Sequence, residues 1–350
     1  MAQQQQQQYS VVQQMLQASQ QTHVTSCTEA HDVQDEIDLT TRPRRNPMED
    51  ANALEQAITA KKPDEGTIID ILTNMTNEQR REVKAVYEKK TGKHLEEGLK
   101  KALSGKLETL MLDLLLTPAQ FDAHKLKAAM KGLGTDEDTL IEILLTRSNK
   151  QIQNIKDVYK QEFKTDLEKD IIDDTSGDFQ KTLLALLKGT RNEEIYASDD
   201  QADKDAKALY EAGEKKKKAD TSVFIPIFAS KSFPHLKKVF NKYATYSKHD
   251  LNKALDLELK GDFENCLVSI VKYAVNPAEF FAEKLHNSMK GLGTRDKDLT
   301  RIIVSRSECN LKAIKAQYKK MYKKTLREDV MADTSGGFET ALVSLLGHDD

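Results

Sequence analysis

Two short glycine loops carry the residue types of this 350-residue chain that are best suited to chemistry. The first is Gly132-Leu133-Gly134-Thr135, and Gly291-Leu292-Gly293-Thr294 repeats it 159 residues later. A dinucleotide or phosphate loop is excluded, because a third glycine, a preceding strand and a Gly-Lys-Ser/Thr ending are missing. Glycines here favour positive φ, which turns carbonyl oxygens outward. Clustered carbonyls are typical of a hard-cation site, since Ca²⁺ takes about six to eight oxygen ligands.

A carboxylate follows each glycine loop at the same distance. Thirty-eight residues separate Thr135 from Asp174, and the same number separates Thr294 from Asp333. If each unit folds back on itself, the carboxylate meets the loop and leaves coordination positions for water or a lipid phosphate. One such unit alone favours turn glycines and a helix-capping Asp-Thr-Ser over a cation site. The identical spacing in two units favours the cation site.

The elements that must position these loops are helices. Apolar residues recur at i, i+3 and i+4 in three separated segments: Ile68, Ile71 and Leu72; Leu140, Ile143 and Leu144; Leu299, Ile302 and Ile303. Long alternating runs are absent, and only seven prolines interrupt the chain. These patterns predict an all-α protein.

Internal repeats predict how the helices are organised. The segment Asp64–Leu72 matches Asp136–Leu144, and Glu258–Phe263 matches Asp174–Phe179. With the two glycine loops, this gives four units of about 70 to 80 residues. We expect a Gln-rich tail over 1–46, followed by repeats over 47–117, 118–190, 191–274 and 275–350.

Composition limits the classes of function. The 53 Lys+Arg and 56 Asp+Glu leave a formal charge of −3, which argues against binding nucleic acid or anionic lipid through bulk positive charge. No apolar run approaches the roughly 20 residues of a membrane span, and no signal segment follows Met1. Three cysteines without metal-ligand spacing favour a reducing compartment. We therefore expect a soluble, cytoplasmic protein.

The tail leaves two interpretations open. Gln fills 11 of its first 21 positions, yet Tyr9, Val12 and Leu16 recur at helical spacing. The segment is either a frayed tail or an amphipathic helix that docks in the groove of a partner.

The glycine loops and their distant carboxylates resemble those of the annexins over about residues 48–346. The resemblance implies four repeats of five helices in a curved disc, with calcium loops on its convex face. It also implies reversible, Ca²⁺-dependent binding to acidic phospholipid membranes, without enzymatic activity.

The resemblance implies calcium ligands in every repeat. Those of the second repeat are the carbonyls of Met130, Gly132 and Gly134 with Thr135 and the Asp174 carboxylate. Those of the fourth repeat are Met289, Gly291, Gly293 and Asp333. The third repeat offers Gly213, Lys216, Lys218, Asp256 and Glu258. Ala219 replaces the usual Thr there and Lys215–Lys218 adds positive charge, so we expect a weaker site.

The first repeat departs furthest from the pattern. The implied ligands are Lys62, Pro63 and Glu65, with a minor site at Lys100, Leu103 and Glu108. The glycine loop is missing, and Ala102 replaces the distant acid.

Two other classes of site are excluded by the sequence. No segment has the acidic alternation of an EF-hand loop, and no Gly-x-Ser-x-Gly indicates a hydrolase.

The resemblance also implies phospholipase A2 inhibition and an S100-type partner for the tail, although the glutamine run replaces the usual helical opening. The alternative from another class is a helical adaptor whose tail recruits a protein. The sequence leaves a nuclear location, and export without a signal peptide, open.

Overall fold

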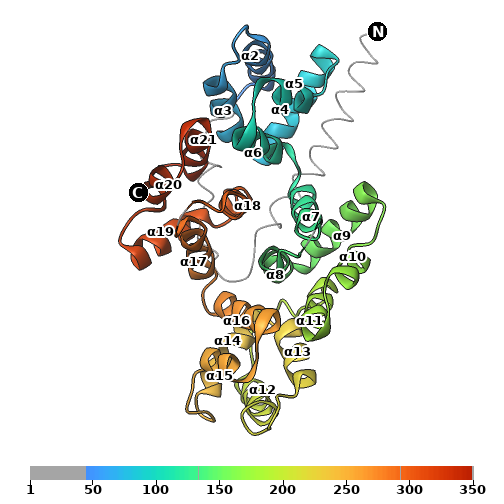
Figure 1. The fold of residues 1–350 in the computed structure, drawn as a ribbon, viewed down its shortest axis with the longest axis vertical. Coiled ribbons are helices and arrows are strands. Elements are labelled where there is room, and N and C mark those ends of the chain that lie inside the picture. Colours follow the sequence, from blue (N-terminus) through green and yellow to red (C-terminus); the bar gives the residue numbers. More distant parts are fainter. Residues whose placement is uncertain (1–44, 133, 292, 349–350) are drawn as a thin grey trace.

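The chain is helical throughout the part that the structure describes. This computed structural model describes residues 45–132, 134–291 and 293–348. Within these ranges it contains 20 helices and no strand (Figure 1), which confirms the all-α prediction. None of the described helices is both long and apolar enough to cross a bilayer. The tail interpretations concern residues that lie outside the described ranges.

The helices form four sets of five, as expected for four repeats. The first set is α2 (Pro47–Thr59), α3 (Glu65–Thr73), α4 (Asn77–Thr91), α5 (Leu95–Ala102) and α6 (Gly105–Leu115). The second is α7 (Pro118–Ala129), α8 (Glu137–Thr146), α9 (Asn149–Phe163), α10 (Leu167–Asp174) and α11 (Gly177–Leu187). The third is α12 (Asp199–Ala212), α13 (Thr221–Ser230), α14 (Phe233–Tyr243), α15 (Leu251–Glu258) and α16 (Gly261–Val275). The fourth is α17 (Pro277–Met289), α18 (Asp296–Arg306), α19 (Leu311–Tyr322), α20 (Leu326–Asp333) and α21 (Gly336–Leu346).

The turn before the last helix has the same backbone in all four repeats. That helix begins each time at a left-handed glycine, with φ between 62° and 72°: Gly105, Gly177, Gly261 and Gly336. A Cβ at any of these positions would meet open space. Glycine is therefore required for its φ and not for room. In the second and fourth repeats, the helix before this turn ends at an Asp that contacts the loop between the first two helices.

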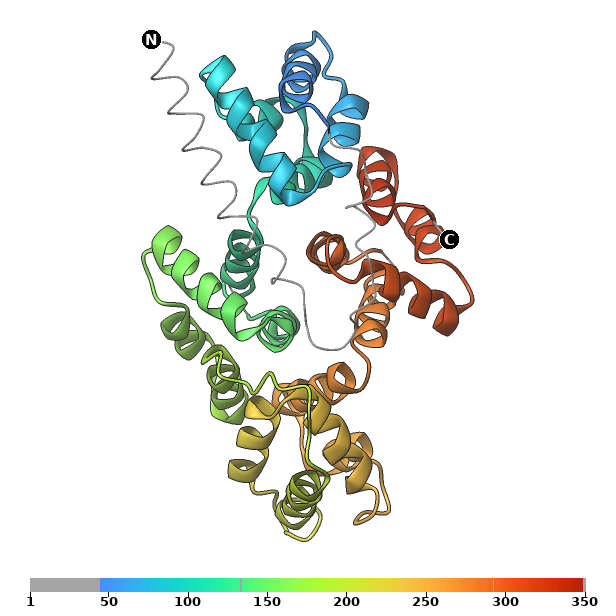
Figure 2. The same ribbon diagram turned by 180° about the vertical axis from the view of Figure 1, so that it is seen from behind.

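The repeats surround a common centre in two neighbouring pairs (Figures 1 and 2). In one pair, α21 of the fourth repeat packs on α3 and α6 of the first. In the other, α11 of the second repeat packs on α13 and α16 of the third. Leu, Ile and Ala side chains dominate the continuous core along these contacts. The packing explains the amphipathic patterns, because each helix buries one apolar stripe.

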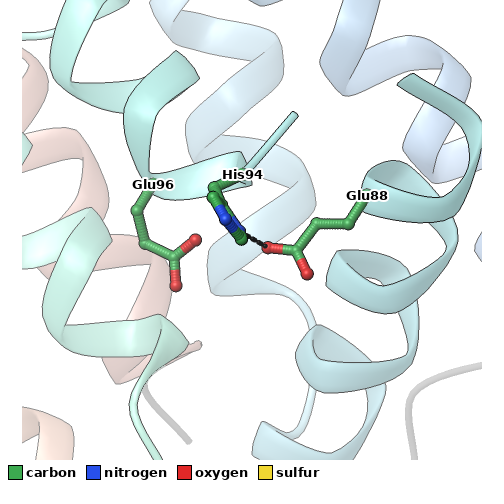
Figure 3. Close-up of side chains that lie close together, drawn as sticks. All are labelled: Glu88, His94 and Glu96. Carbon is green, nitrogen blue, oxygen red and sulfur yellow. Dashed lines mark hydrogen bonds and ion pairs between the residues drawn. The ribbon is translucent and has the colours of Figure 1, made fainter. Parts of the chain in front are cut away.

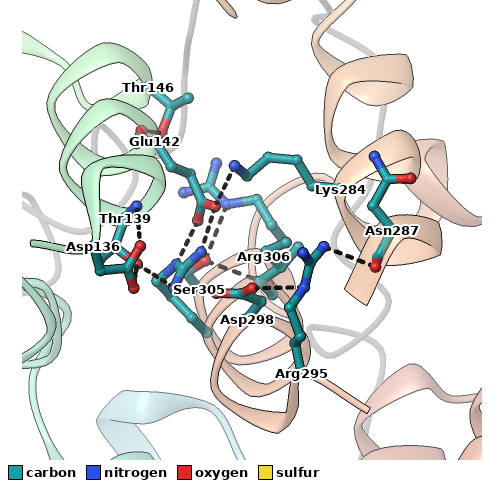
Figure 4. A network of polar contacts seen from close by, with 12 residues as sticks. Asp136, Thr139, Glu142, Thr146, Lys284, Asn287, Arg295, Asp298, Ser305 and Arg306 are labelled. Carbon is teal, nitrogen blue, oxygen red and sulfur yellow. Dashed lines mark hydrogen bonds and ion pairs between the residues drawn. The ribbon is translucent and has the colours of Figure 1, made fainter. Parts of the chain in front are cut away.

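A buried ion cluster joins the second and fourth repeats across the centre (Figure 4). Arg301 of α18 donates from Nε to Oε1 of Glu142 at 3.0 Å and from Nη2 to Oε2 at 2.9 Å. The Lys284 ammonium lies 3.5 Å from the same carboxylate. Burial alone would raise the pKa of Glu142, but the positive charges of Arg301 and Lys284 lower it to about 2. Glu142 therefore remains ionised inside the protein.

Candidate metal centres

The loop between the first two helices is closed in the same way in every repeat. The residue before the second helix donates its backbone N–H to a carbonyl in the last turn of the first helix. The four bonds are Asp64 to Ala57 at 3.0 Å, Asp136 to Ala129 at 2.9 Å, Asp220 to Ala212 at 2.7 Å and Arg295 to Ser288 at 2.7 Å. The bonded residues lie seven apart, except in the third repeat, where they lie eight apart. The lysine-rich loop therefore contains one additional residue.

The glycine loops of the second and fourth repeats share an unusual backbone. Gly132 and Gly134 have φ of 107° and 88°, while Gly291 and Gly293 have 107° and 85°. Ideal Cβ atoms at these positions would touch nothing within 4 Å. Only the backbone conformation requires glycine there, since side chains with a Cβ are strained at such φ. The conformation agrees with the inference that these glycines direct loop carbonyls.

The distant carboxylates reach these loops. The Thr135 hydroxyl donates to Oδ2 of Asp174 at 2.7 Å and lies 3.2 Å from its backbone oxygen. In the fourth repeat, Thr294 donates to Oδ2 of Asp333 at 2.6 Å, and its hydroxyl lies 2.9 Å from the Asp333 backbone oxygen. The structure thus brings together residues that are 39 positions apart, in the same way in both repeats.

The donor set of these two loops fits a calcium ion. Each Asp is the last residue of a helix, α10 or α20, where backbone carbonyls lack intrahelical partners. No described residue donates a hydrogen bond to Oδ1 of Asp174 or Asp333, and both side chains are half-buried. Carboxylate and carbonyl oxygens are the ligands that Ca²⁺ prefers. Met130, Gly132 and Gly134 with Asp174, and Met289, Gly291 and Gly293 with Asp333, would hold the ions.

The third loop is built differently. Gly213 has φ −100°, and no residue from 213 to 219 has positive φ. A Cβ on Gly213 would lie 3.1 Å from the Phe224 ring and 3.2 Å from the Leu209 carbonyl, so this glycine provides room for packing. The Lys216 ammonium binds Asp220 at 2.8 Å, and Lys218 is exposed.

The acids of the third repeat do not repeat the Thr–Asp contact. Glu258 is half-buried. Burial and the hydrogen bond to Glu214 raise the pKa of Tyr243, and the negative charge of Glu258 adds to this. Asp256 is exposed and accepts from Lys253 at 2.5 Å. Residues two apart on a helix do not face each other, so α15 presents Asp256 and Glu258 on different sides. Only Glu258 stands in the place of Asp174.

The first repeat lacks the left-handed loop. No residue from 60 to 66 has positive φ, and Lys62 is exposed while Pro63 is half-buried. Asp64 caps α3 by accepting from the Thr67 amide at 3.1 Å and from its hydroxyl at 2.7 Å. The Glu65 carboxylate lies beside the fourth repeat, 3.2 Å from where a Cβ on Gly337 would be. Residues of the fourth repeat therefore form part of the surroundings of Glu65.

The minor site lies at the turn between α5 and α6. Leu103 donates its N–H to the Leu99 carbonyl, so the carbonyls that follow, from Lys100 to Leu103, have no partner further along α5. Glu108 is half-buried in the first turn of α6. The sequence places all three predicted residues at this turn, but no contact between them distinguishes it as a site.

One group of supporting residues was missed in the sequence. A buried tyrosine on the third helix donates to an acid eleven residues later: Tyr159 to Asp170 at 2.5 Å and Tyr318 to Asp329 at 2.6 Å. In the third repeat, Tyr243 donates at 2.6 Å to Glu214 within the lysine-rich loop. Burial and these acids raise the pKa of all three tyrosines. The repeated Tyr–Asp spacing was the available signal.

A second cluster lies outside every predicted site (Figure 3). Glu88, His94 and Glu96 bring one ligand atom each to within 4.8 Å of one another. His94 Nδ1 lies 3.1 Å from Glu88 Oε1, and Lys84 pairs with Glu96. An imidazole nitrogen is a poor calcium ligand, and the lysine already neutralises one carboxylate. This cluster therefore does not resemble the two glycine-loop centres.

Known proteins share this arrangement of repeats. The annexin family model matches four ranges of the chain, 49–114, 121–186, 204–270 and 280–345. Annexin A1 of Equus caballus is 58% identical over 307 residues, which cover 88% of this chain and 89% of that protein. The solved structure of annexin III is 42% identical with a TM-score of 0.86, over 88% of this chain and 96% of that one. A structure of calcium-bound annexin (Sm)1 is 30% identical with a TM-score of 0.77, over 87% and 90% of the two chains.

Proposed function

This chain belongs to the annexin family, and we propose that it is a calcium-dependent phospholipid-binding protein that docks reversibly on acidic membranes. One observation carries the proposal: two loops with left-handed glycines each receive a distant Asp through a Thr hydroxyl. The same three-part arrangement occurs twice, in two separate repeats.

The residues of each centre have separate tasks. The glycines direct backbone oxygens, the Asp contributes negative charge, and the Thr hydroxyl fixes one carboxylate oxygen so that the other remains available. Bound calcium supplies positive charge between these oxygens and the phosphates of an acidic lipid. The formal charge of −3 means that the protein has no bulk attraction to such a membrane before calcium binds.

Co-sedimentation with phosphatidylserine vesicles tests the function. We expect the full chain to pellet with vesicles in calcium and to remain in the supernatant when a chelator is in excess. Pelleting that persists in the chelator would contradict the calcium bridge. No pelleting at any calcium concentration, with the chain shown to be folded, would contradict membrane binding itself.

The centres are unequal in this proposal. Those of the second and fourth repeats bind calcium best, while the third repeat, with Gly213, Glu258 and its lysines, binds more weakly. The first repeat contributes Lys62, Pro63 and Glu65 and the minor site of Lys100, Leu103 and Glu108. Calcium titration of vesicle binding by variants of each centre ranks them.

Phospholipase A2 inhibition follows from the same activity if the protein covers the substrate lipid. Inhibition should then disappear when lipid is in large excess over the protein. Inhibition that is undiminished at saturating lipid would instead indicate direct contact with the enzyme.

The tail adds a separable proposal, the recruitment of an S100-type protein. Deleting residues 1–44 should abolish capture of that partner and leave calcium-dependent pelleting intact. We further propose a non-enzymatic, cytoplasmic protein that moves to membranes as calcium rises. Imaging of a fluorescent fusion during calcium release checks this location.

A further inference from the structure

The connection between the second and third repeats exposes one tyrosine almost completely. Tyr196 is 92% exposed, and Ile195 beside it is 60% exposed. They lie between α11 and α12, in a stretch without helix. We infer that Tyr196 is the phosphate acceptor for a protein tyrosine kinase that selects acidic substrates. This inference is independent of the calcium centres.

The hydroxyl of Tyr196 differs from those of the other described tyrosines. The other eight described tyrosines are buried or half-buried: Tyr87, Tyr159, Tyr210, Tyr243, Tyr246, Tyr273, Tyr318 and Tyr322. Several of their hydroxyls already donate to carboxylates, as Tyr159 does to Asp170 and Tyr246 does to Asp203 at 2.8 Å. No described residue accepts a hydrogen bond from the Tyr196 hydroxyl, so it is available to an enzyme without unfolding.

The backbone around Tyr196 is held on both sides but not at the tyrosine. On one side, Asn192 donates its N–H to the Ser230 carbonyl at 2.8 Å. On the other, the Lys238 ammonium donates to the Ala197 carbonyl at 2.8 Å. Neither Ile195 nor Tyr196 has a backbone hydrogen bond to another described residue. Their N–H and C=O groups can therefore pair with an enzyme that binds its substrate as an extended strand.

The charges around Tyr196 indicate the class of kinase. Glu193 and Glu194 precede it, Asp199 and Asp200 follow it, and all four residues are exposed. One positive charge lies among them, because the Lys238 ammonium is 3.1 Å from Oδ1 of Asp199. The Glu194 amide and carboxylate both contact the side chain of Asn192, at 2.7 and 3.2 Å, which keeps this turn ordered. A basic substrate groove would complement this acidic segment, whereas a kinase that requires basic residues would find none between 192 and 203.

The reaction is an ordinary phosphoryl transfer from Mg·ATP. The Tyr196 Oη forms a bond to the γ-phosphorus, the bond from that phosphorus to the β,γ-bridging oxygen breaks, and ADP leaves. The hydroxyl proton passes to the catalytic Asp of the kinase. The product carries about 1.5 to 2 additional negative charges in a segment with four carboxylates, of which only Asp199 is paired with a lysine of the described part of the chain, Lys238. Because like charges repel, we expect the phosphate to remain directed outward.

The test uses the full chain, labelled ATP and a tyrosine kinase domain that phosphorylates Glu-Tyr copolymer. The variants are Tyr196→Phe, Tyr9→Phe and the double variant; Tyr9 is included because it lies outside the described residues. We expect Tyr196→Phe to lose most of the label and Tyr9→Phe to keep most of it. Peptide mapping by mass spectrometry should place the phosphate on the peptide that contains Tyr196.

A second comparison tests the acidic context. Glu193→Gln with Glu194→Gln should lower kcat/KM of the kinase for the chain several-fold, while Glu97→Gln, an exposed acid elsewhere, should leave it unchanged. Thermal unfolding confirms that each variant is folded. Full labelling of Tyr196→Phe, no labelling of the wild-type chain, or phosphate mapped only to another tyrosine would each overturn the inference.

Discussion

The second and fourth repeats differ from the first and third at the same point of the fold. All four close the loop between their first two helices with equivalent backbone hydrogen bonds. Only the second and fourth place two left-handed glycines inside that loop and bind a distant Asp through Thr. The difference shows that the repeat provides a common frame, and that a few residues decide whether the frame presents oxygen ligands.

The same two repeats also meet at the centre of the molecule. Glu142 of the second repeat and Arg301 of the fourth form a two-pronged ion pair that is fully buried. The two strongest candidate centres therefore belong to repeats that are tied directly to each other. Variants of the central ion pair, of the loop ligands and of the loop lysines test this comparison between the repeats separately.

Breaking the buried Glu142–Arg301 ion pair should have the largest effect, a loss of folding stability. Glu142→Gln leaves Arg301 and Lys284 facing a neutral amide, and losing one partner of a buried pair costs about 3–5 kcal/mol. Glu97→Gln, at an exposed position of α5, is the control and should cost less than about 1 kcal/mol. Denaturant unfolding of both variants measures the difference. Equal stabilities would show that the pair does not hold the repeats together.

The same pair predicts a pH dependence. The folded-state pKa of Glu142 is about 2, below its ordinary value of 4.5. A lowered pKa means that the ionised carboxylate stabilises the fold fully above pH 4.5, and that this contribution is lost as the pH falls toward 2. The gap in unfolding free energy between wild type and Glu142→Gln should therefore narrow across this window. A gap that stays constant from pH 6 to pH 3 would contradict the assignment.

Removing the distant acids should have the next largest effect. Asp174→Ala with Asp333→Ala should raise the calcium needed for vesicle binding by at least about tenfold, because each loss removes a charged ligand. Glu65→Ala with Glu108→Ala should raise it far less. Calcium titrations of co-sedimentation measure both double variants. A larger effect of the Glu65 and Glu108 variant would mean that the first repeat, and not the second and fourth, holds the stronger calcium centres.

Replacing the loop glycines should raise the calcium requirement of vesicle binding less than removing the distant acids does. Gly132→Ala with Gly134→Ala forces two side chains into left-handed backbone at about 1–2 kcal/mol each, without any steric contact. The loop is then expected to relax and the calcium requirement to rise. Gly92→Ala is the control, since Gly92 has φ 67° and open space but ends α4. It should lower the melting temperature and leave the calcium requirement unchanged.

The lysines of the third loop should have the smallest effect. Replacing the exposed Lys217 and Lys218 by alanine should lower the calcium concentration needed for vesicle binding by less than about fivefold. The effect is small because exposed charges contribute about 0–1 kcal/mol. The change should shrink as salt increases. Lys237→Ala, an exposed lysine on α14, is the control. A higher calcium requirement would mean instead that the loop lysines contact lipid phosphates.

Much of the two strong centres could be predicted from the sequence. The loops around Gly132 and Gly291 and the acids Asp174 and Asp333 were identified from spacing, because repetition shows which separations the fold preserves. The structure confirms that Thr and Asp meet in both repeats. The ligand sets themselves and the repeat boundaries stay predictions.

The third loop could not be predicted in the same way. Gly213 matched the pattern of a loop glycine, but it provides room for Phe224 and does not adopt positive φ. Whether a glycine is present for its backbone or for space depends on the atoms opposite it. The Phe224 ring comes from another helix, α13, and its position is not encoded in the sequence around Gly213.

The sequence by itself determined the helices, their four-fold repetition and the chemical types of the loop residues. These features depend on local periodicity, on backbone preferences of individual residues and on regular spacing along one chain. The tertiary structure alone decided that Glu142 meets Arg301, that Glu65 lies against the fourth repeat and that Tyr196 remains uncovered. The two contacts join residues far apart in the chain, and the exposure of Tyr196 depends on which elements pack near it. All three are therefore decided only when the helices have packed and buried their apolar faces.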